Sequence, residues 1–167
     1  MRATIKTMFL ASLVFTSVPG RANAQGDGNL FEMIFEVNLE QDARVATRNG
    51  KHLMIMFVKE GCAPCIRMKK TVLSDPAVQS YFRQNFVSYQ VNIFGDLPVI
   101  DLDGERRTEK QYAKRQGIWG TPVFYFLGED GRLVYKRIGF IGKQDFMKIG
   151  KYVSAHGYEA LETVDHH

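Results

Sequence analysis

The sequence predicts an α/β domain in which a mixed central sheet is covered by helices on both faces. Segments of helical and strand-like periodicity alternate along the chain, which favours parallel strands joined by helices. One strand-like run, HLMIMFV at residues 52–58, is apolar almost throughout, as is typical of a strand buried on both faces. The last two strand-like runs are separated only by a turn, which predicts an antiparallel hairpin at one edge.

The chain opens with the pattern of a secretory signal peptide over residues 1–24. Arg2 and Lys6 precede a mostly apolar run at residues 8–18, and Ala22-Asn23-Ala24 forms a small-x-small cleavage pattern. A permanent membrane anchor is the alternative, but the run is far shorter than the roughly 20 residues that a spanning helix needs. We therefore expect a periplasmic protein, secreted across the inner membrane, with no stable membrane insertion after the signal is removed.

The rest of the chain is long enough for one compact domain. We expect a flexible Gly-, Asp- and Asn-rich N-terminus at residues 25–29, the domain at residues 30–158 and a C-terminal tail at residues 159–167. The formal charge of +4 includes three bases and no acid from residues 1–24, so the remaining chain is nearly neutral. This charge gives no argument for a nucleic-acid partner.

The first half of the domain contains clear signals for where helices begin and end. Apolar positions at helical spacing predict a helix over residues 29–48, with a break near Asn38 as an option, and Asn49-Gly50 can end it. The buried strand at residues 52–58 comes next. A helix then runs from the cysteine pair to about Val72, and Ser74-Asp75-Pro76 starts a second one over residues 76–83.

The second half follows the same alternation. Aromatic and β-branched residues predict a strand at 86–93, and a longer loop is expected at 94–107. Thr108 and Gln111 resemble a capping box for a helix that ends near Gly117. Two strands at 123–127 and 133–138 flank the turn Gly128-Glu129-Asp130-Gly131, and a last helix covers 143–155.

The residues that carry chemistry are Cys62 and Cys65, where the buried strand meets the next helix. Backbone N–H groups and the helix dipole favour a thiolate at a helix N-terminus, so the pKa of Cys62 should fall below the usual thiol value of about 8.5. Cys62 is therefore the predicted attacking sulfur, and Cys65, one turn inward and less exposed, is the predicted resolving thiol. Pro64, early in the helix, restricts the geometry between them.

Two other interpretations of the cysteine pair stay open. The pair could form an inert local disulfide, although a loop that encloses only Ala63 and Pro64 stabilises little. It could also be half of a zinc site, but this needs two more ligands. The other candidate ligands are four histidines: His52 begins a strand, His156 follows a helix, and His166 and His167 look like a feature of the chain end. We therefore expect neither a metal nor another cofactor.

Three stretches together resemble the thioredoxin superfamily: GCAPC after the apolar strand, GIWGTPV at residues 117–123 and DGRLVYKRIG at residues 130–139. The order and spacing cover about residues 50–155. The loop at 93–108 and the run RMKKTVLSDPAVQSYF look most like periplasmic thioredoxins associated with sulfur oxidation.

This resemblance implies a substrate-binding site beside the cysteines. Pro122 is expected to follow a cis peptide bond that exposes the backbone of Thr121 to an incoming peptide, with an ordinary trans proline as the alternative. Trp119 is expected either at the rim of that groove or as a half-buried packing residue.

Two departures from the family pattern concern catalysis. Met56 stands where cytoplasmic thioredoxins carry a buried acid, and Glu60 is the nearest substitute unless it is only a solvated loop charge. Gly61 replaces the tryptophan that is common before the first cysteine, which leaves the approach to Cys62 more open.

The resemblance implies an exported thiol-disulfide oxidoreductase. We expect it to reduce disulfides of periplasmic partner proteins with electrons from a membrane thiol donor. The alternatives are an oxidant that donates disulfides to exported proteins, and a protein-binding or chaperone module that uses the same groove without turnover. No inserted helical domain of the kind found in such oxidants is visible in the sequence.

Overall fold

The structure, a computed structural model, describes residues 30–32, 36–128 and 131–159. The predicted signal peptide, the predicted flexible N-terminus and nearly all of the predicted tail lie outside these residues, as do Glu129 and Asp130 of the predicted hairpin turn. Within the described ranges, no helix is both long and apolar enough to cross a membrane.

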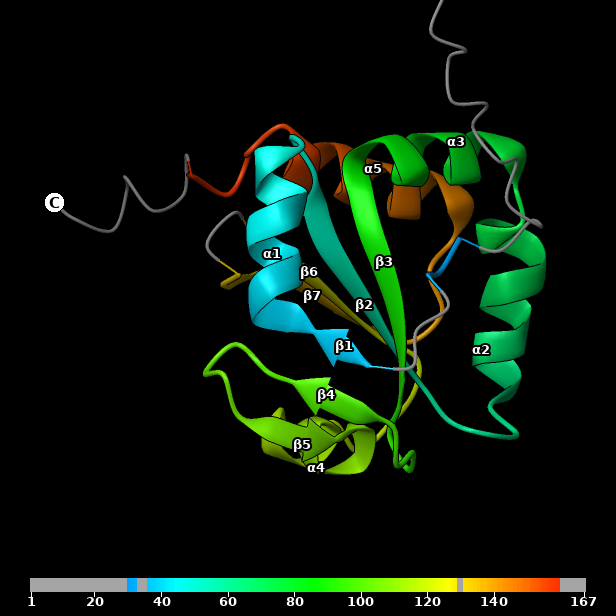
Figure 1. Ribbon diagram of the computed structural model, residues 1–167. Coiled ribbons are helices and arrows are strands. Elements are labelled where there is room, and N and C mark those ends of the chain that lie inside the picture. Colours follow the sequence, from blue (N-terminus) through cyan, green and yellow to red (C-terminus); the bar gives the residue numbers. More distant parts are fainter. Residues whose placement is uncertain (1–29, 33–35, 129–130, 160–167) are drawn as a thin grey trace, which may run out of the picture.

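A four-stranded mixed sheet forms the centre of the molecule (Figure 1). Its strands lie in the order β3 (Phe86–Asn92), β2 (His52–Val58), β6 (Val123–Leu127) and β7 (Leu133–Ile138). β2 is parallel to β3 and antiparallel to β6, and β6 and β7 form the predicted hairpin. The predicted α/β fold with a mixed sheet is thus confirmed.

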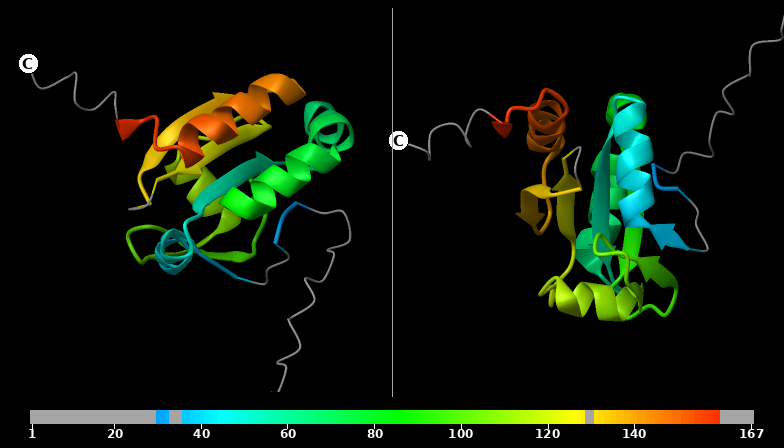
Figure 2. Two further views of the ribbon diagram at one scale, coloured as in Figure 1. Left: turned by 90° about the horizontal axis from the view of Figure 1, so that it is seen from above. Right: turned by 60° about the vertical axis from the view of Figure 1, so that its left-hand side comes forward.

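The apolar run of β2 is explained by two hydrophobic cores, one on each face of the sheet. Met54 and Met56 face the core beneath α2 (Ala63–Met68), α3 (Pro76–Asn85) and α5 (Lys143–Ser154). Leu53, Ile55 and Phe57 face the core beneath α1 (Leu39–Arg48) and α4 (Glu109–Arg115). Figure 2 shows α1 and α5 on opposite sides of the strands. Because successive side chains of a strand point to opposite faces, burial on both faces requires an unbroken apolar run.

Most of the predicted elements are confirmed to within two residues. β2, β6 and β7 have the predicted bounds, and α3, β3, α4 and α5 differ by one or two residues at an end. The helix predicted to reach Val72 consists of α2 and a π-helical segment, η1 (Lys69–Leu73). The capping box is present, because Thr108 Oγ1 accepts from Gln111 N and Gln111 Oε1 accepts from Thr108 N.

The helix predicted over residues 29–48 is wrong in its first half. α1 begins at Leu39, and Asn38, where a break was an option, is its N-cap and accepts a hydrogen bond from Gln41 N at 3.0 Å. Before it, Val37–Asn38 forms the short strand β1. The apolar spacing misled because Leu30 and Phe31 reach the core on the opposite face from α1, while Glu32 N donates to Ser88 O at the edge of β3.

The loop predicted at residues 94–107 contains two short strands, β4 (Pro98–Ile100) and β5 (Arg106–Thr108). They join β1 in a second, three-stranded sheet. The strands are too short to show strand periodicity, and their turn is held by an ion pair in which Arg107 Nε lies 2.6 Å from the buried Asp101 carboxylate. This turn and α4 lie together below the main sheet (Figure 1).

Candidate active site

The two cysteines lie where β2 passes into α2. Cys62 is the N-cap of α2 and has extended backbone angles, and Pro64 occupies the first turn of the helix. Gly61 has a φ of +67°, a backbone conformation that residues other than glycine rarely adopt. In this chain a glycine therefore suits the turn that presents Cys62, and a tryptophan in the same backbone conformation would be strained.

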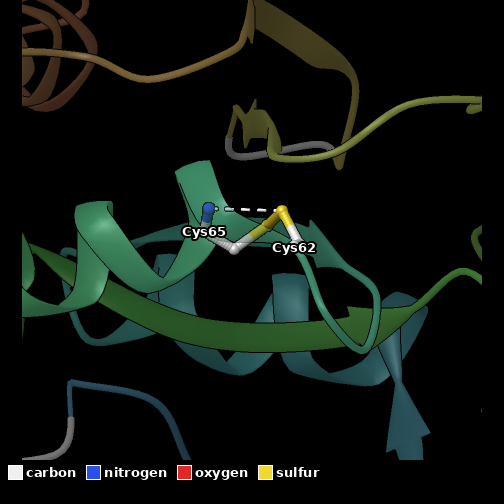
Figure 3. Close-up of a disulfide and its surroundings, with 2 residues drawn as sticks. All are labelled: Cys62 and Cys65. Carbon is white, nitrogen blue, oxygen red and sulfur yellow. Dashed lines mark hydrogen bonds between the residues drawn. A yellow bond between two sulfur atoms is a disulfide. The ribbon is translucent and has the colours of Figure 1, made fainter.

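Cys62 and Cys65 form a disulfide, with their Cα atoms 5.2 Å apart (Figure 3). The backbone N–H of Cys65 donates to Cys62 Sγ at 3.2 Å, so the sulfur takes the place of a capping oxygen. A donor aimed at Cys62 Sγ stabilises negative charge there and gives nothing comparable to Cys65. The two sulfurs therefore differ in their backbone contacts within the disulfide.

Exposure distinguishes the two cysteines very little in this disulfide form. Cys62 is 4% exposed and Cys65 is 3% exposed, and both belong to the core beneath α2, α3 and α5. The prediction that Cys65 is the less exposed residue thus rests on a very small difference. Ala63 and Pro64, which lie between the cysteines, are exposed.

No carboxylate is buried in the cysteine-side core of the described residues. Met56 is fully buried in that core, together with Met54 and Met68. Glu60 is exposed in the loop before Cys62, which favours its interpretation as a solvated charge.

The buried carboxylates that the structure does describe serve other contacts. Asp101 pairs with Arg107, and Glu109 Oε1 accepts from Asn92 N at 2.8 Å. Burial, the largest effect, raises the pKa of Glu109 above its ordinary value, and the hydrogen bond from Asn92 opposes this rise. Both residues belong to the α4 side of the molecule and not to the cysteine-side core.

The segment before β6 runs along the same end of the sheet as the cysteines. Phe57 near the end of β2 pairs with Val123 at the start of β6, so Thr121 and Pro122 lie at the edge where the cysteine loop begins. The Thr121–Pro122 peptide bond is cis, and Gly139 N donates to Pro122 O at 2.8 Å. Pro122 is buried, and among the described atoms Thr121 Oγ1 is also buried and accepts or donates no hydrogen bond.

Trp119 is 76% exposed, so its interpretation as a half-buried packing residue is wrong. It lines a hollow together with residues that sequence reasoning did not select: Ile93, Phe94, Lys110, Lys114 and Ile118. Phe94, which was assigned only to a loop, is 64% exposed. A large aromatic residue directly after a predicted strand was the available signal for it.

The two described histidines lie apart from the cysteine pair. Across the described ranges, no three His, Cys, Asp or Glu side chains gather as a metal site would require. His52 is the first residue of β2 and stacks edge-on with His156, whereas the cysteines follow the last residue of that strand. These histidines therefore lie at the opposite end of the sheet from the sulfurs.

A family model described as "Thioredoxin-like domain" matches residues 39–154 of this chain. No curated protein matches the sequence significantly.

The solved structures that are similar to this chain include the following three. A thioredoxin-fold protein from Helicobacter pylori is 20% identical, with a TM-score of 0.63 over 81% of this chain and 83% of that one. A thioredoxin from Thermus thermophilus is 26% identical, with a TM-score of 0.58 over 79% and 95%. The C-terminal domain of DsbD from Neisseria meningitidis, in the oxidised form, is 18% identical, with a TM-score of 0.50 over 69% and 92%.

Proposed function

Since this chain belongs to the thioredoxin-like domain family, we propose that it is an exported thiol-disulfide oxidoreductase that reduces disulfides of periplasmic partner proteins. The observation that carries the proposal is the disulfide between Cys62 and Cys65 at the start of α2. A bridge between residues three apart constrains the unfolded chain little. We therefore infer that the bridge serves the protein by being reduced and re-formed.

The reaction transfers two electrons from the dithiol to the partner. The Cys62 thiolate attacks one sulfur of the partner's disulfide: a bond forms between Cys62 and that sulfur, the partner's own bond breaks, and its other sulfur leaves as a thiolate. Cys65 then loses its proton and attacks Cys62 Sγ. The bond between Cys62 and Cys65 forms, the mixed disulfide breaks, and the second partner sulfur leaves; both partner thiolates take up a proton from water.

The position of each cysteine supports these roles. Cys62 has the helix N-terminus and the N–H of Cys65 to stabilise its thiolate. Cys65 lies within bonding reach of Cys62 from the first turn of α2, so resolution needs no large movement. Pro64 begins this turn without requiring an N–H, which keeps the two sulfurs close.

The segment before β6 supplies the proposed contact with the partner's main chain. Thr121 lies at the cysteine end of the sheet, and it is only partly buried. A partner segment can add to it by main-chain hydrogen bonds in the manner of strand addition, which brings the partner's disulfide to Cys62. Trp119, which lies two residues before Thr121, is exposed and adds an aromatic side chain next to this segment.

The reducing direction is supported by likeness to thioredoxins, including the 26% identity with the Thermus thermophilus protein. A reductant must itself be reduced again, and we assign this role to the dithiol of a membrane protein. The pattern of residues 1–24 supports export. Within the family, the loop at 93–108 and the run RMKKTVLSDPAVQSYF support a relation to periplasmic thioredoxins associated with sulfur oxidation.

Trapping tests this function. Cys65→Ser should hold partners as mixed disulfides through Cys62, which dithiothreitol releases and mass spectrometry identifies. The matched control is the double variant Cys62→Ser/Cys65→Ser, which keeps the surface but has no thiol. We expect it to retain no partner after denaturing washes, and wild-type protein with dithiothreitol to reduce insulin. A wild-type protein that reduces no protein disulfide, while the double variant binds the same partners under native conditions, would establish the binding-module alternative.

A further inference from the structure

Exposed apolar and cationic side chains gather at the cysteine end of the sheet. We define the docking surface as Phe94, Trp119, Lys110 and Lys114, all exposed, with the buried Ile93 and Ile118 beneath them. These residues enclose a mostly apolar hollow of about 120 Å³. At about 30 Å³ per water molecule in the liquid, the hollow is large enough to accept an apolar side chain in place of several waters.

The docking surface lies at the cysteine end of the sheet but on the other face. Ile93 N donates to Val58 O, the last residue of β2, so Phe94 follows directly on the edge where the cysteine loop starts. Ile93 and Ile118 belong to the core beneath α1 and α4, whereas Cys62 belongs to the opposite core. A partner segment that runs across this end of the sheet can thus reach both.

The loop that presents Phe94 is held in place by α4. Glu109 Oε1 accepts from Asn92 N at 2.8 Å, Lys110 N donates to Gly95 O at 2.9 Å, and Glu109 N donates to Leu97 O at 2.9 Å. A Cβ atom on Gly95 would overlap the Glu109 carboxylate, which shows how closely the loop fits this helix end. Because the loop is already ordered, binding loses little conformational entropy there.

The charged residues that line the hollow are two lysines, with no carboxylate among the lining residues. Lys110 and Lys114 are one turn apart on α4 and share a face, and within the described residues no ion pair joins either one to a carboxylate. The arginines farther along, Arg107 and Arg115, are paired with Asp101 and Asp103. Among these four bases, the two lysines are therefore the ones that form no ion pair within the described residues.

We propose that the docking surface selects partner proteins in which an apolar side chain, flanked by acidic residues, lies next to the disulfide to be reduced. The apolar side chain enters the hollow between Trp119 and Phe94, and the carboxylates meet Lys110 and Lys114. This inference rests on the proposed function and adds to it the chemistry of the substrate. Complementary charge at a solvent-exposed rim acts mainly on encounter and selectivity, whereas buried aromatic contacts provide most of the affinity.

Three peptides of equal length test the proposal, each with the same internal disulfide. The flank next to the disulfide is Glu-Leu-Glu in one, Ser-Leu-Ser in the second and Lys-Leu-Lys in the third. For wild-type protein we expect kcat/KM for the acidic peptide to exceed that for the basic one about tenfold at low ionic strength. Adding 0.5 M salt should remove most of this preference.

Matched charge reversals localise the effect. In Lys110→Glu/Lys114→Glu the preference for the acidic peptide should disappear or invert. In Lys148→Glu/Lys151→Glu, which makes the same change of charge on the exposed face of α5, most of it should remain. Trp119→Ala should lower kcat/KM for all three Leu-containing peptides by about tenfold or more.

The outcomes separate this inference from the proposed function. If no peptide is reduced, the proposed function has failed. If all peptides are reduced at equal rates, or if both charge-reversed proteins change the preference equally, the protein is a reductase and the docking surface does not select. A concentration-dependent dimer that Trp119→Ala abolishes would overturn the inference in favour of a second copy of this chain as the occupant.

Discussion

The difference between the two sulfurs leads to a quantitative prediction for the reduced protein. In Cys65→Ser, Cys62 keeps its place at the N-terminus of α2 and the N–H of residue 65. A helix end favours a negative charge by about 1 kcal/mol, and a hydrogen bond to a charged group adds about 1.5 kcal/mol. Burial at 4% exposure opposes both effects.

The two stabilising effects lower the pKa of Cys62 below the value of about 8.5 for a free thiol, and burial limits how far it falls. At pH 7 the thiolate fraction of Cys62 should therefore exceed that of a free thiol. A lower pKa also weakens the nucleophile, by about threefold for each unit, so the gain in reaction rate is smaller than the gain in thiolate fraction.

Alkylation by iodoacetamide against pH measures this difference directly. We expect the half-maximal rate for Cys65→Ser at a pH below the free-thiol value of about 8.5. For Cys62→Ser, whose Cys65 lies among methionines without a donor of this kind, we expect a value above 8.5. Thermal unfolding of both variants checks that they are folded. A lower midpoint for Cys65 than for Cys62 would reverse the assigned roles.

Three further predictions concern the elements that hold the site. Burial raises the pKa of Glu109 in the folded protein, so the free energy of unfolding decreases as pH rises from the pKa of the unfolded chain, about 4.3, to the higher pKa of the folded protein. Glu109→Gln should therefore be more stable than wild type at pH 7. Urea titrations should show that this difference vanishes near pH 3. Gly150→Ala should destabilise by about 1–3 kcal/mol, since its Cβ would lie 2.8 Å from the stacked ring of Phe82; an unchanged urea midpoint would show that the ring moves freely. Thr108→Ala removes the capping box of α4 and should cost about 1 kcal/mol, a loss that Thr108→Ser should largely restore.

The sequence predicts the central sheet well because its strands are buried on both faces. The apolar run at 52–58 and the hairpin at 123–138 are compatible with few other strand arrangements. Because the cysteine pair follows β2 directly, its position at one end of the sheet is determined by that strand. Local patterns are sufficient where burial is continuous and the chain changes direction at glycine or proline.

The failures occur where contacts distant in sequence decide the structure. Leu30 and Phe31 have helical spacing relative to α1, but they pack on the other face of the sheet. β4 and β5 are short and depend on pairing with β1 and on the ion pair between Asp101 and Arg107. For the same reason, the sequence did not select Phe94: its exposure and its place beside Trp119 arise only when β3 and the segment before β6 meet.

The reduction potential tests most directly whether the protein is a reductant. Lys59 and Glu60 lie in the exposed loop before Cys62 with opposite effects on its thiolate, so each should change the potential little. Purified protein equilibrated against glutathione buffers, with free thiols counted by mass after alkylation, gives the value. We expect a potential near that of thioredoxin, about −270 mV. A potential near the value of strong disulfide-forming oxidants, about −120 mV, would contradict the reducing role and favour disulfide donation to exported proteins.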